Sequence, residues 1–492
     1  MLVSYKTEHL NKFLATAWEK HSEVNDIELI DDRIQDDLIR RSFRLELSSP
    51  LLGFALIPGG CVASLTIPIS GSIMTETYIN YDSDTFPHIL YDMSQQDIPK
   101  DLYNLKVSVP VESVTGDVGA DRVNICTKWD NNIIAFGRAS AEDTHIILHF
   151  ASPVAQYSVD IVEPATERAS VASNPLNNAS DLIKQWFNNR ANVSSIHCKL
   201  APVRPMGGIS GELGMFLKPK NFRLVPNGDA VCIYIKIEGS GATEGDIKPS
   251  FTDVDGAVIC PIPEGSSASI IFSHRLLHEK VFLPLLQQCQ GIYSEGPLKS
   301  IAWGNGGRGF WYGFYLKGES NVNMEDQSEV YTSNMSAVKA RMDDAMTTMN
   351  IEDNRVTFSY SQTYQVEWRN DFTTLDDEPH PGLTRAGELE VVLRQTGKAF
   401  STDNSNLILD LSISRNSFSL RKWSTVPGVR LFNNVQNGRI EFQDVVLRSP
   451  NVSFIAAESV LAPGATMIKT THVDTPYDLI LVGDMVDRVA RE

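Results

Sequence analysis

Hydrophobic and polar residues alternate along much of this chain, and that pattern most constrains its fold. A period of two places every second side chain on the same face of a β-strand. The longest example carries large hydrophobic residues on one side, at Val356, Phe358, Tyr360, Tyr364, Val366 and Trp368. The same alternation marks ranges 407–413, 233–237, 106–111 and 145–150. No regular exchange of strands with helices accompanies it, so the pattern predicts mainly antiparallel sheets.

Four segments instead place hydrophobic residues at helical spacing. One runs from Leu10 to Trp18, and a second begins at Ser180 as N-cap. The longest is predicted over 266–290, with a kink at Pro284, and a fourth over 335–349, where methionines form the stripe. Together with the strands, these helices predict an α+β fold that consists predominantly of long, curved antiparallel sheets wrapped around a few long amphipathic helices.

A polar stretch rich in Ser, Ala and Asn, from Glu167 to Asn178, separates two portions that each open with a helix followed by strands. We therefore expect two units, 1–170 and a larger one, 171–492. The length of 492 residues is ample for a sizeable hydrophobic core without disulfides or structural metals.

One long uncharged run, from Ser48 to Thr75, raises the question of a membrane span. Three prolines and four glycines interrupt it, and they would break a helix repeatedly. Two or three buried strands joined by turns explain the run better. We expect no transmembrane segment.

The charge balance excludes some partners. With 43 Lys and Arg against 61 Asp and Glu, the formal net charge is −18. Nucleic-acid binding depends on basic side chains that neutralise phosphates, and no basic block occurs, so no nucleic-acid partner is expected.

The amino terminus lacks the layout of a secretory signal. The six cysteines form no C-x-x-C pair. We therefore expect synthesis in the cytoplasm with reduced cysteines, which is compatible with later release outside the cell.

Motifs for catalysis or cofactors are weak. Gly304–Gly309 spells G-x-G-x-x-G, but an aromatic run typical of a strand follows it, where dinucleotide binding needs a helix. His274 and His278 have the i, i+4 spacing of two metal ligands, without the glutamate of H-E-x-x-H or a third ligand. A solvated helix face is the simpler interpretation. We predict a non-enzymatic protein without metal or cofactor, and an enzyme with a site built from distant residues, such as these histidines, is the remaining alternative.

The densest aromatic cluster lies around these glycines and comprises Trp303, Phe310, Trp311, Tyr312, Phe314 and Tyr315. Large rings around glycines can line an apolar groove, enter a membrane interface, form a partner surface or fill a core.

The segment from Pro261 to Leu286 resembles the tubular lipid-binding (TULIP) proteins. Its small, serine-rich entry into an amphipathic helix that reaches a proline is similar to the OrfX-type branch, encoded beside bacterial toxin genes. The ranges 3–14 and 216–222 resemble the N-terminal helix and a strand of that branch. The resemblance implies a long helix wrapped by a curved antiparallel sheet, an apolar channel of lipid size, and participation in a toxin complex.

Two interpretations follow. The preferred one is a TULIP-like binding protein that holds a lipid or other apolar ligand, binds partner proteins of a toxin complex, or does both. The alternative is a structural or assembly protein whose β-surface binds other subunits without any ligand. For the preferred interpretation the expected contact residues are Ile270, Ile271, Leu276, Leu277, Val281, Trp303, Phe310, Trp311, Tyr312 and Phe314.

Overall fold

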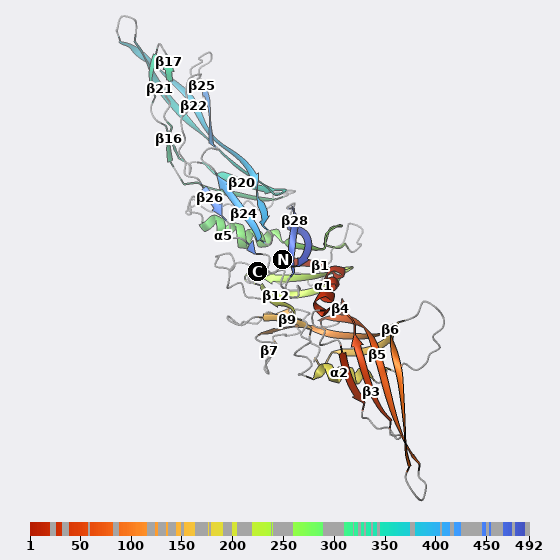
Figure 1. The fold of residues 1–492 in the computed structure, drawn as a ribbon. Helices are drawn as coiled ribbons and strands as arrows, with labels where there is room; N and C mark the ends of the chain where they lie inside the picture. Colours follow the sequence, from red (N-terminus) through yellow and green to blue (C-terminus); the bar gives the residue numbers. More distant parts are fainter. Residues whose placement is uncertain are drawn as a thin grey trace, which may run out of the picture.

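A computed structural model shows an elongated molecule with the two chain ends near its middle (Figure 1). The structure describes the chain apart from residues 20–25, 32–38, 58–59, 82–87, 116–123, 126–133, 136–143, 149–151, 163–175, 177–178, 190–198, 204–218, 238, 240–258, 289–308, 318, 323–325, 329–330, 336–337, 342–344, 374–378, 404–405, 414–417, 425–444, 449–451, 454–465, 475–477 and 488–492.

The middle of the molecule is a seven-stranded antiparallel sheet, called the central sheet below. Its strands follow the order β28-β29-β14-β1-β13-β12-β8. They are β1 (Leu2–Lys6), β8 (Ile134–Ala135), β12 (Pro219–Asn227), β13 (Ala230–Ile237), β14 (Ala268–Phe272), β28 (Thr466–Asp474) and β29 (Leu479–Asp487). The first strand of the chain thus lies between two strands that are more than 220 residues away in sequence.

The N-terminal arm is a second antiparallel sheet, built on the long hairpin of β5 and β6 (Figure 1). It contains β2 (Asp26–Asp31), β3 (Ile39–Leu47), β4 (Leu51–Ile57), β5 (Gly60–Tyr81), β6 (His88–Thr115), β7 (Asn124–Ile125), β9 (Thr144–Leu148), β10 (Gln156–Ile161) and β11 (Lys199–Val203). The pairing of β5 with β6 shifts register between Ile69 and Gly71. There Gly71 has φ +140°, a backbone conformation that side chains disfavour.

Two helices belong to this arm. α1 (Thr7–Glu19) packs beside β4, where the side-chain amide of Asn11 donates to the carbonyl of Leu52 and accepts from its N–H, at 3.2 and 2.7 Å. α2 (Ala179–Asn188) buries Ile183 and Phe187, and Phe187 stacks on Tyr157 of β10 with ring centroids 5.4 Å apart.

The C-terminal arm is built on a second long hairpin, of β21 and β22. Its main sheet contains β15 (Phe310–Phe314), β17 (Asp326–Ser328), β18 (Tyr331–Met335), β20 (Thr347–Glu352), β21 (Arg355–Thr373), β22 (Pro379–Lys398) and β25 (Phe418–Ser424). Smaller sheets pair β16 (Glu319–Val322) with β19 (Val338–Arg341), and join β23 (Phe400–Asp403), β24 (Asn406–Ile413), β26 (Val445–Arg448) and β27 (Val452–Ser453).

A helical run over 274–288 accompanies this arm. It consists of α4 (His274–Leu277), the π-helix η4 (His278–Phe282) and α5 (Leu283–Gln288). α5 lies beside β24 and β26 in Figure 1.

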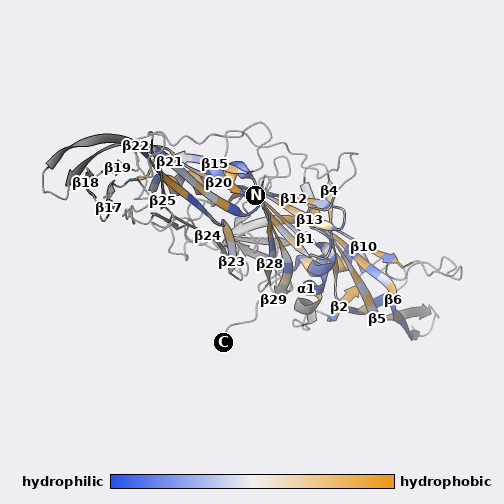
Figure 2. Ribbon diagram, turned by 90° about the horizontal axis from the view of Figure 1, so that it is seen from above, coloured by the Kyte–Doolittle hydropathy of each residue, from blue (hydrophilic) through white to orange (hydrophobic). Residues whose placement is uncertain are grey.

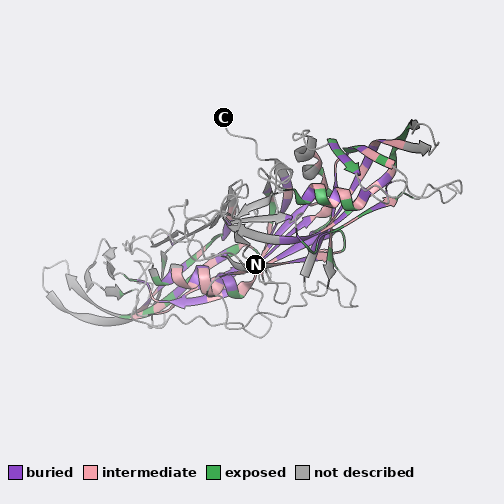
Figure 3. Ribbon diagram, turned by 90° about the horizontal axis from the view of Figure 1, so that it is seen from below, coloured by how far each residue is buried: buried purple, intermediate pink, exposed green. Residues whose placement is uncertain are grey.

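One continuous hydrophobic core links the central sheet with both arms, since its members include Leu45, Ile233 and Phe358. Hydrophobic and hydrophilic residues alternate along the strands of both arms (Figure 2). Buried residues run through the strands between the two ends of the molecule (Figure 3).

The structure confirms the β-dominant character that the alternation predicted. Val356, Phe358 and Tyr360 are buried along one face of β21. The uncharged run over 48–75 forms β4 and part of β5. In the described part of the chain, no helix is long and apolar enough to cross a membrane.

The helix predictions hold only in part. α1 covers the predicted Leu10–Trp18 segment, and α2 begins at Ala179, one residue before the predicted cap. The predicted helix over 266–290 is wrong in its first half, because Ala268–Phe272 is strand β14, paired with β1 on one side and β29 on the other. The predicted helix over 335–349 is also wrong, since its residues fall in β18, β19 and β20. The described helices are therefore short.

The predicted boundary at Glu167–Asn178 lies almost wholly outside the described residues and stays a prediction. Strands from the two sides of it pair with each other in the central sheet: β1 with β13 and β14, and β8 with β12.

Candidate helix–sheet site

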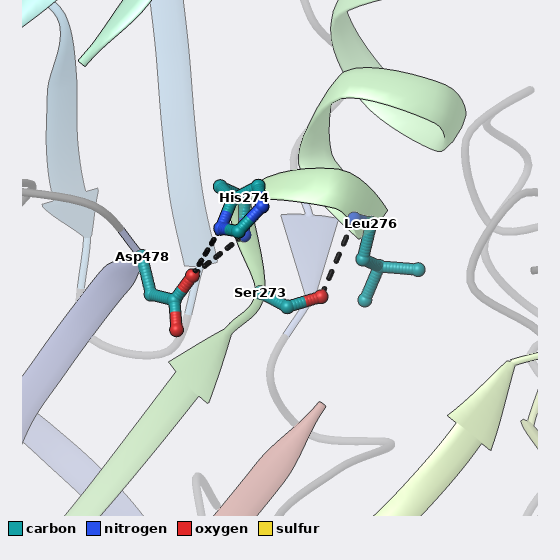
Figure 4. Close-up of polar contacts among 4 residues, drawn as sticks. All are labelled: Ser273, His274, Leu276 and Asp478. Atoms are coloured by element: carbon teal, nitrogen blue, oxygen red, sulfur yellow. Dashed lines mark hydrogen bonds and ion pairs between the residues drawn. The ribbon is translucent and has the colours of Figure 1, made fainter. Parts of the chain in front are cut away.

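The helical run starts at two side-chain caps (Figure 4). The hydroxyl of Ser273 accepts a hydrogen bond from the N–H of Leu276 at 3.3 Å. The carboxylate of Asp478 accepts from the N–H of His274 at 2.8 Å, and lies 2.9 Å from Nδ1 of the same residue. These bonds satisfy N–H groups that a helix start otherwise leaves unpaired. Because Asp478 directly precedes β29, they attach the helical run to the central sheet.

The middle of the run is a π-helix, in which the N–H of Leu283 donates to the carbonyl of His278, five residues earlier. Pro284 follows and has no N–H to continue the α-helical pattern. A π-turn inserts one residue and rotates the buried face. Val281 and Phe282, although adjacent, are both buried as a result.

Phe282 joins the helical run to the C-terminal arm. Its ring centroid lies 4.9 Å from that of Phe310, 5.5 Å from that of Tyr312 and 6.1 Å from that of Phe400. Phe282 is fully buried. Aromatic pairs at these separations add stabilisation to that of their buried area. The helical run therefore packs on the face of β15 that carries Phe310, Tyr312 and Phe314, called the inner face below.

His278 and Tyr312 add a polar contact to this junction. The imidazole Nδ1 lies 3.1 Å from the phenol oxygen, and the rings are 5.6 Å apart and nearly parallel. Burial lowers the pKa of His278 from its ordinary value of 6.5, and nearby Glu279 opposes part of that shift. Burial also raises the pKa of Tyr312. The neutral imidazole is the favoured partner of the neutral phenol.

This lowered pKa predicts acid sensitivity of the junction. The folded protein binds the His278 proton less tightly than the unfolded chain, so its contribution to stability is present above pH 6.5 and is lost as pH falls through the lower folded pKa. We expect His278→Gln to show a smaller fall in Tm between about pH 7 and pH 5 than the natural protein. Parallel melting curves measure it, and identical pH profiles would contradict it. The effect is small because His278 is only half buried.

Thr347 lies on the same inner face, opposite Phe314 in the pairing of β15 with β20. Its side chain is fully buried, and its hydroxyl has no hydrogen-bond partner among the described residues. An unpaired buried hydroxyl costs about 1–3 kcal/mol. Its neighbours along β20 and β21 on this face are Met349, Phe358 and Tyr360, all buried. The hydroxyl of Thr347 is thus a polar group among largely apolar and aromatic side chains, and these residues of the inner face are called the wall below.

Strand β19 contacts the wall beyond Thr347. The phenol groups of Tyr360 and Tyr364 donate to the carbonyl of Arg341, at 3.2 and 3.0 Å, and the phenol of Tyr364 accepts from the N–H of Arg341 at 3.2 Å. These bonds attach the two-stranded sheet of β16 and β19 to β21. The helical run and this small sheet contact the inner face at two places, with Phe314 and Thr347 on the same face.

The structure brings the two groups of predicted contact residues to one junction through Phe282, although the predicted residues differ in where their side chains lie. Leu276, Leu277 and Val281 are buried in the helical run, and Phe310, Tyr312 and Phe314 on the inner face. Ile270 is buried in β14, whereas Ile271 is half-buried on the opposite face of that strand. Trp311 is half-buried on the opposite face of β15, and Trp303 lies outside the described residues.

Sequence reasoning missed Phe282, Phe400 and Thr347. Phe282 falls off an ideal helical stripe through Val281, and only the π-turn brings it to the sheet. Phe400 and Thr347 come from distant strands and carry no local signal. His278 was considered as a metal ligand and interpreted as part of a solvated helix face, whereas the structure places it half-buried on Tyr312.

Metal binding finds no support among the described residues, where no three His, Cys, Asp or Glu side chains gather as a metal would need. His274 contacts Asp478, and His278 contacts Tyr312. The glycines of the G-x-G-x-x-G spelling lie outside the described residues, except Gly309. The aromatic run after them is strand β15, as its sequence predicted.

The chain matches no family model and no curated protein. Among solved structures it matches a crystal structure of lipopolysaccharide binding protein, over 99% of this chain and 99% of that chain. The sequence identity is 11% and the TM-score is 0.25, a likeness too weak to carry an argument about family or ligand.

Proposed function

We propose that this protein is a non-enzymatic, TULIP-like binding protein whose ligand is a lipid or another amphipathic molecule. The ligand would lie against the inner face of the C-terminal arm, between the helical run and the small sheet of β16 and β19. Its apolar part would contact Phe314 and Tyr360. Burial of several hundred Å² of an acyl chain, at about 25 cal/mol per Å², gives several kcal/mol without any reactive group.

The observation that carries this proposal is the unpaired hydroxyl of Thr347. Folded proteins pair nearly all buried polar atoms, so an exception indicates a partner supplied from elsewhere. A threonine in the middle of an aromatic wall gives a ligand's carbonyl or hydroxyl one fixed hydrogen-bond partner. Sites for apolar ligands commonly combine an apolar lining with a few such polar groups.

Thr347→Val tests the proposal, because it removes the hydroxyl and keeps the shape. Native mass spectrometry after organic extraction first establishes which lipid co-purifies, and titration with the fluorescent fatty acid cis-parinaric acid gives affinities. We expect the affinity of the variant to fall about three- to tenfold, the loss of one hydrogen bond. Its stability should stay equal or rise, since an unpaired buried polar group has been removed.

Thr348→Val is the matched control. Thr348 is the next residue, points to the other face of β20, and its hydroxyl donates to the carbonyl of Ser359 at 3.3 Å. We expect this variant to keep its affinity. Absence of any bound lipid in native spectra, together with equal affinities in both variants, would contradict the proposal.

A specific observation favours the alternative, an assembly protein that binds other subunits. Residues 92–97 of β6 pair with β5 on one side, and none of the described strands pairs with the other side. All six side chains are exposed, including Met93 at 53%. Open strand edges are sites for pairing with another chain. A native spectrum with a protein subunit bound and no lipid would favour this alternative.

Other aspects belong to the same proposal. The OrfX-type resemblance of the sequence supports a role as an accessory protein in a toxin complex. Synthesis in the cytoplasm, with release by lysis or a non-classical route, is consistent with that role. The acidic surface supports a soluble protein that meets its partners through specific patches.

A further inference from the structure

A short segment crosses the outer face of the central sheet, opposite the main core. It comprises residues 259–262, called the strap below. The side-chain amide of Asn227, at the end of β12, donates to the carbonyl of Ile259 at 3.0 Å. The hydroxyl of Ser269, in β14, donates to the carbonyl of Pro261 at 2.9 Å. Cys260 is the residue between these two attachments, so the strap carries it over the strands that separate β12 from β14.

Cys232 lies in that interval. It pairs with Ser4 of β1, and Ser4 pairs on its other side with Ser269. Directly paired residues project to the same face of a sheet, so Cys232, Ser4 and Ser269 form one row beneath the strap. The hydroxyl of Ser4 donates to the sulfur of Cys232 at 3.6 Å, and the thiol is fully buried.

A small apolar cluster lies on the same face of the central sheet. Its buried members are Leu2, Val225 and Cys232, with Tyr234 and Ile271 packed against them. In the strap itself, Pro261 and Ile262 are buried, whereas Ile259 is 45% exposed.

We propose that Cys232 and Cys260 form a disulfide under oxidising conditions, and that this bond fixes the strap over the outer face of the central sheet. Both cysteines are free thiols in the structure. In the reduced protein the strap is held by packing and by the two hydrogen bonds from Asn227 and Ser269. The redox state of the two cysteines then controls how firmly the strap is attached, on a surface separate from the helix–sheet site.

The chemistry needs a small disulfide such as oxidised glutathione. The thiolate of Cys260, the more accessible sulfur, attacks it and releases one glutathione, which leaves a mixed disulfide on Cys260. The deprotonated sulfur of Cys232 then attacks the Cys260 sulfur and releases the second glutathione. Two protein thiols become one disulfide, and one glutathione disulfide becomes two thiols, so electrons and protons balance.

The thiols react slowly near neutral pH. Burial raises the pKa of Cys232 to about 11, and the nearby Cys260 adds to that shift. Burial, aided by the carboxylate of Asp229 beside the sulfur, raises the pKa of Cys260 as well. Only thiolates attack disulfides, so the rate of disulfide formation should increase with pH and should still be increasing at about pH 9.

The full-length protein, incubated with oxidised glutathione at about pH 9, tests the proposal. After the remaining thiols are alkylated, a non-reduced digest is analysed by mass spectrometry. We expect a linked peptide pair containing Cys232 and Cys260 that disappears on reduction. Oxidation should also raise Tm, because the bond restricts the unfolded chain.

Two kinds of variant keep the result interpretable. Cys232→Ser and Cys260→Ser should each retain the fold by circular dichroism, lose the linked peptide and lose the rise in Tm. Cys61→Ser, in β5 of the N-terminal arm, should change neither the linked peptide nor the rise in Tm. Glutathione left on Cys260, both thiols still free, or a linked peptide that contains a different cysteine would each overturn the proposal, provided that the protein is folded.

Discussion

Gly71→Ala is expected to destabilise the N-terminal arm by at least about 3 kcal/mol. An added Cβ would lie 2.0 Å from the backbone carbonyl oxygen of Arg44, and backbone atoms cannot move aside as a flexible side chain can. The φ of +140° adds strain for any residue with a side chain. The position matters because β5 changes its register on β6 beside Gly71. Chemical denaturation followed by circular dichroism measures the loss.

Gly53→Ala is the matched control, in neighbouring strand β4. The added Cβ would meet its nearest atom, the carbonyl oxygen of Ser64, at 3.7 Å, which is an ordinary contact. We expect this variant to unfold within about 0.5 kcal/mol of the natural protein. If both alanine variants lost equally little, the close approach at Gly71 would not be required by the fold.

Phe282→Ala is expected to cost about 3–5 kcal/mol, the range found for a buried phenylalanine reduced to alanine. The change removes contacts to three aromatic rings at once, two in β15 and one in β23, and leaves a cavity where the helical run packs on the sheet. Because the π-turn aims Phe282 at the sheet, neighbouring helix residues cannot replace it. Urea unfolding monitored by tryptophan fluorescence measures the change.

Trp311→Ala provides the comparison for Phe282. It removes a larger side chain from the neighbouring strand β15, but from the face opposite the junction, where Trp311 is only half-buried. We expect a markedly smaller loss, about 1 kcal/mol. Equal losses in the two variants would show that the helix–sheet contact contributes no more than ordinary aromatic burial.

The strands were predictable because their signal is local. Alternation identified β13 and β21 without knowledge of their partners, and prolines in the run over 48–75 correctly excluded a membrane helix. Segment 268–272 was harder to predict, since its small and β-branched residues fit a strand or the start of a helix. Pairing with β1 and β29, from opposite ends of the chain, decides in favour of a strand.

The methionine stripe misled for a related reason. Met335 and Met349 fit helical spacing, but each is paired in a sheet. Met335 pairs with Trp368, and Met349 pairs with Tyr312 on one side and Phe358 on the other. Long-range pairing overrides local propensity there. The candidate site follows the same logic. The aromatic residues of β15 were visible in the sequence, whereas the unpaired hydroxyl of Thr347 becomes visible only when β15, β20 and β21 are paired.

The order of strands in the central sheet has a consequence for biosynthesis. Leu2–Lys6 is made before its partners Ala230–Tyr234 and Ala268–Ile271, which emerge from the ribosome much later. The hairpin of β5 and β6, in contrast, pairs residues that are close in sequence and can form early. Loop closure over such distances slows folding. The first strand must therefore stay unpaired until more than 220 further residues have been made, and a chaperone that covers its hydrophobic side chains would prevent premature association.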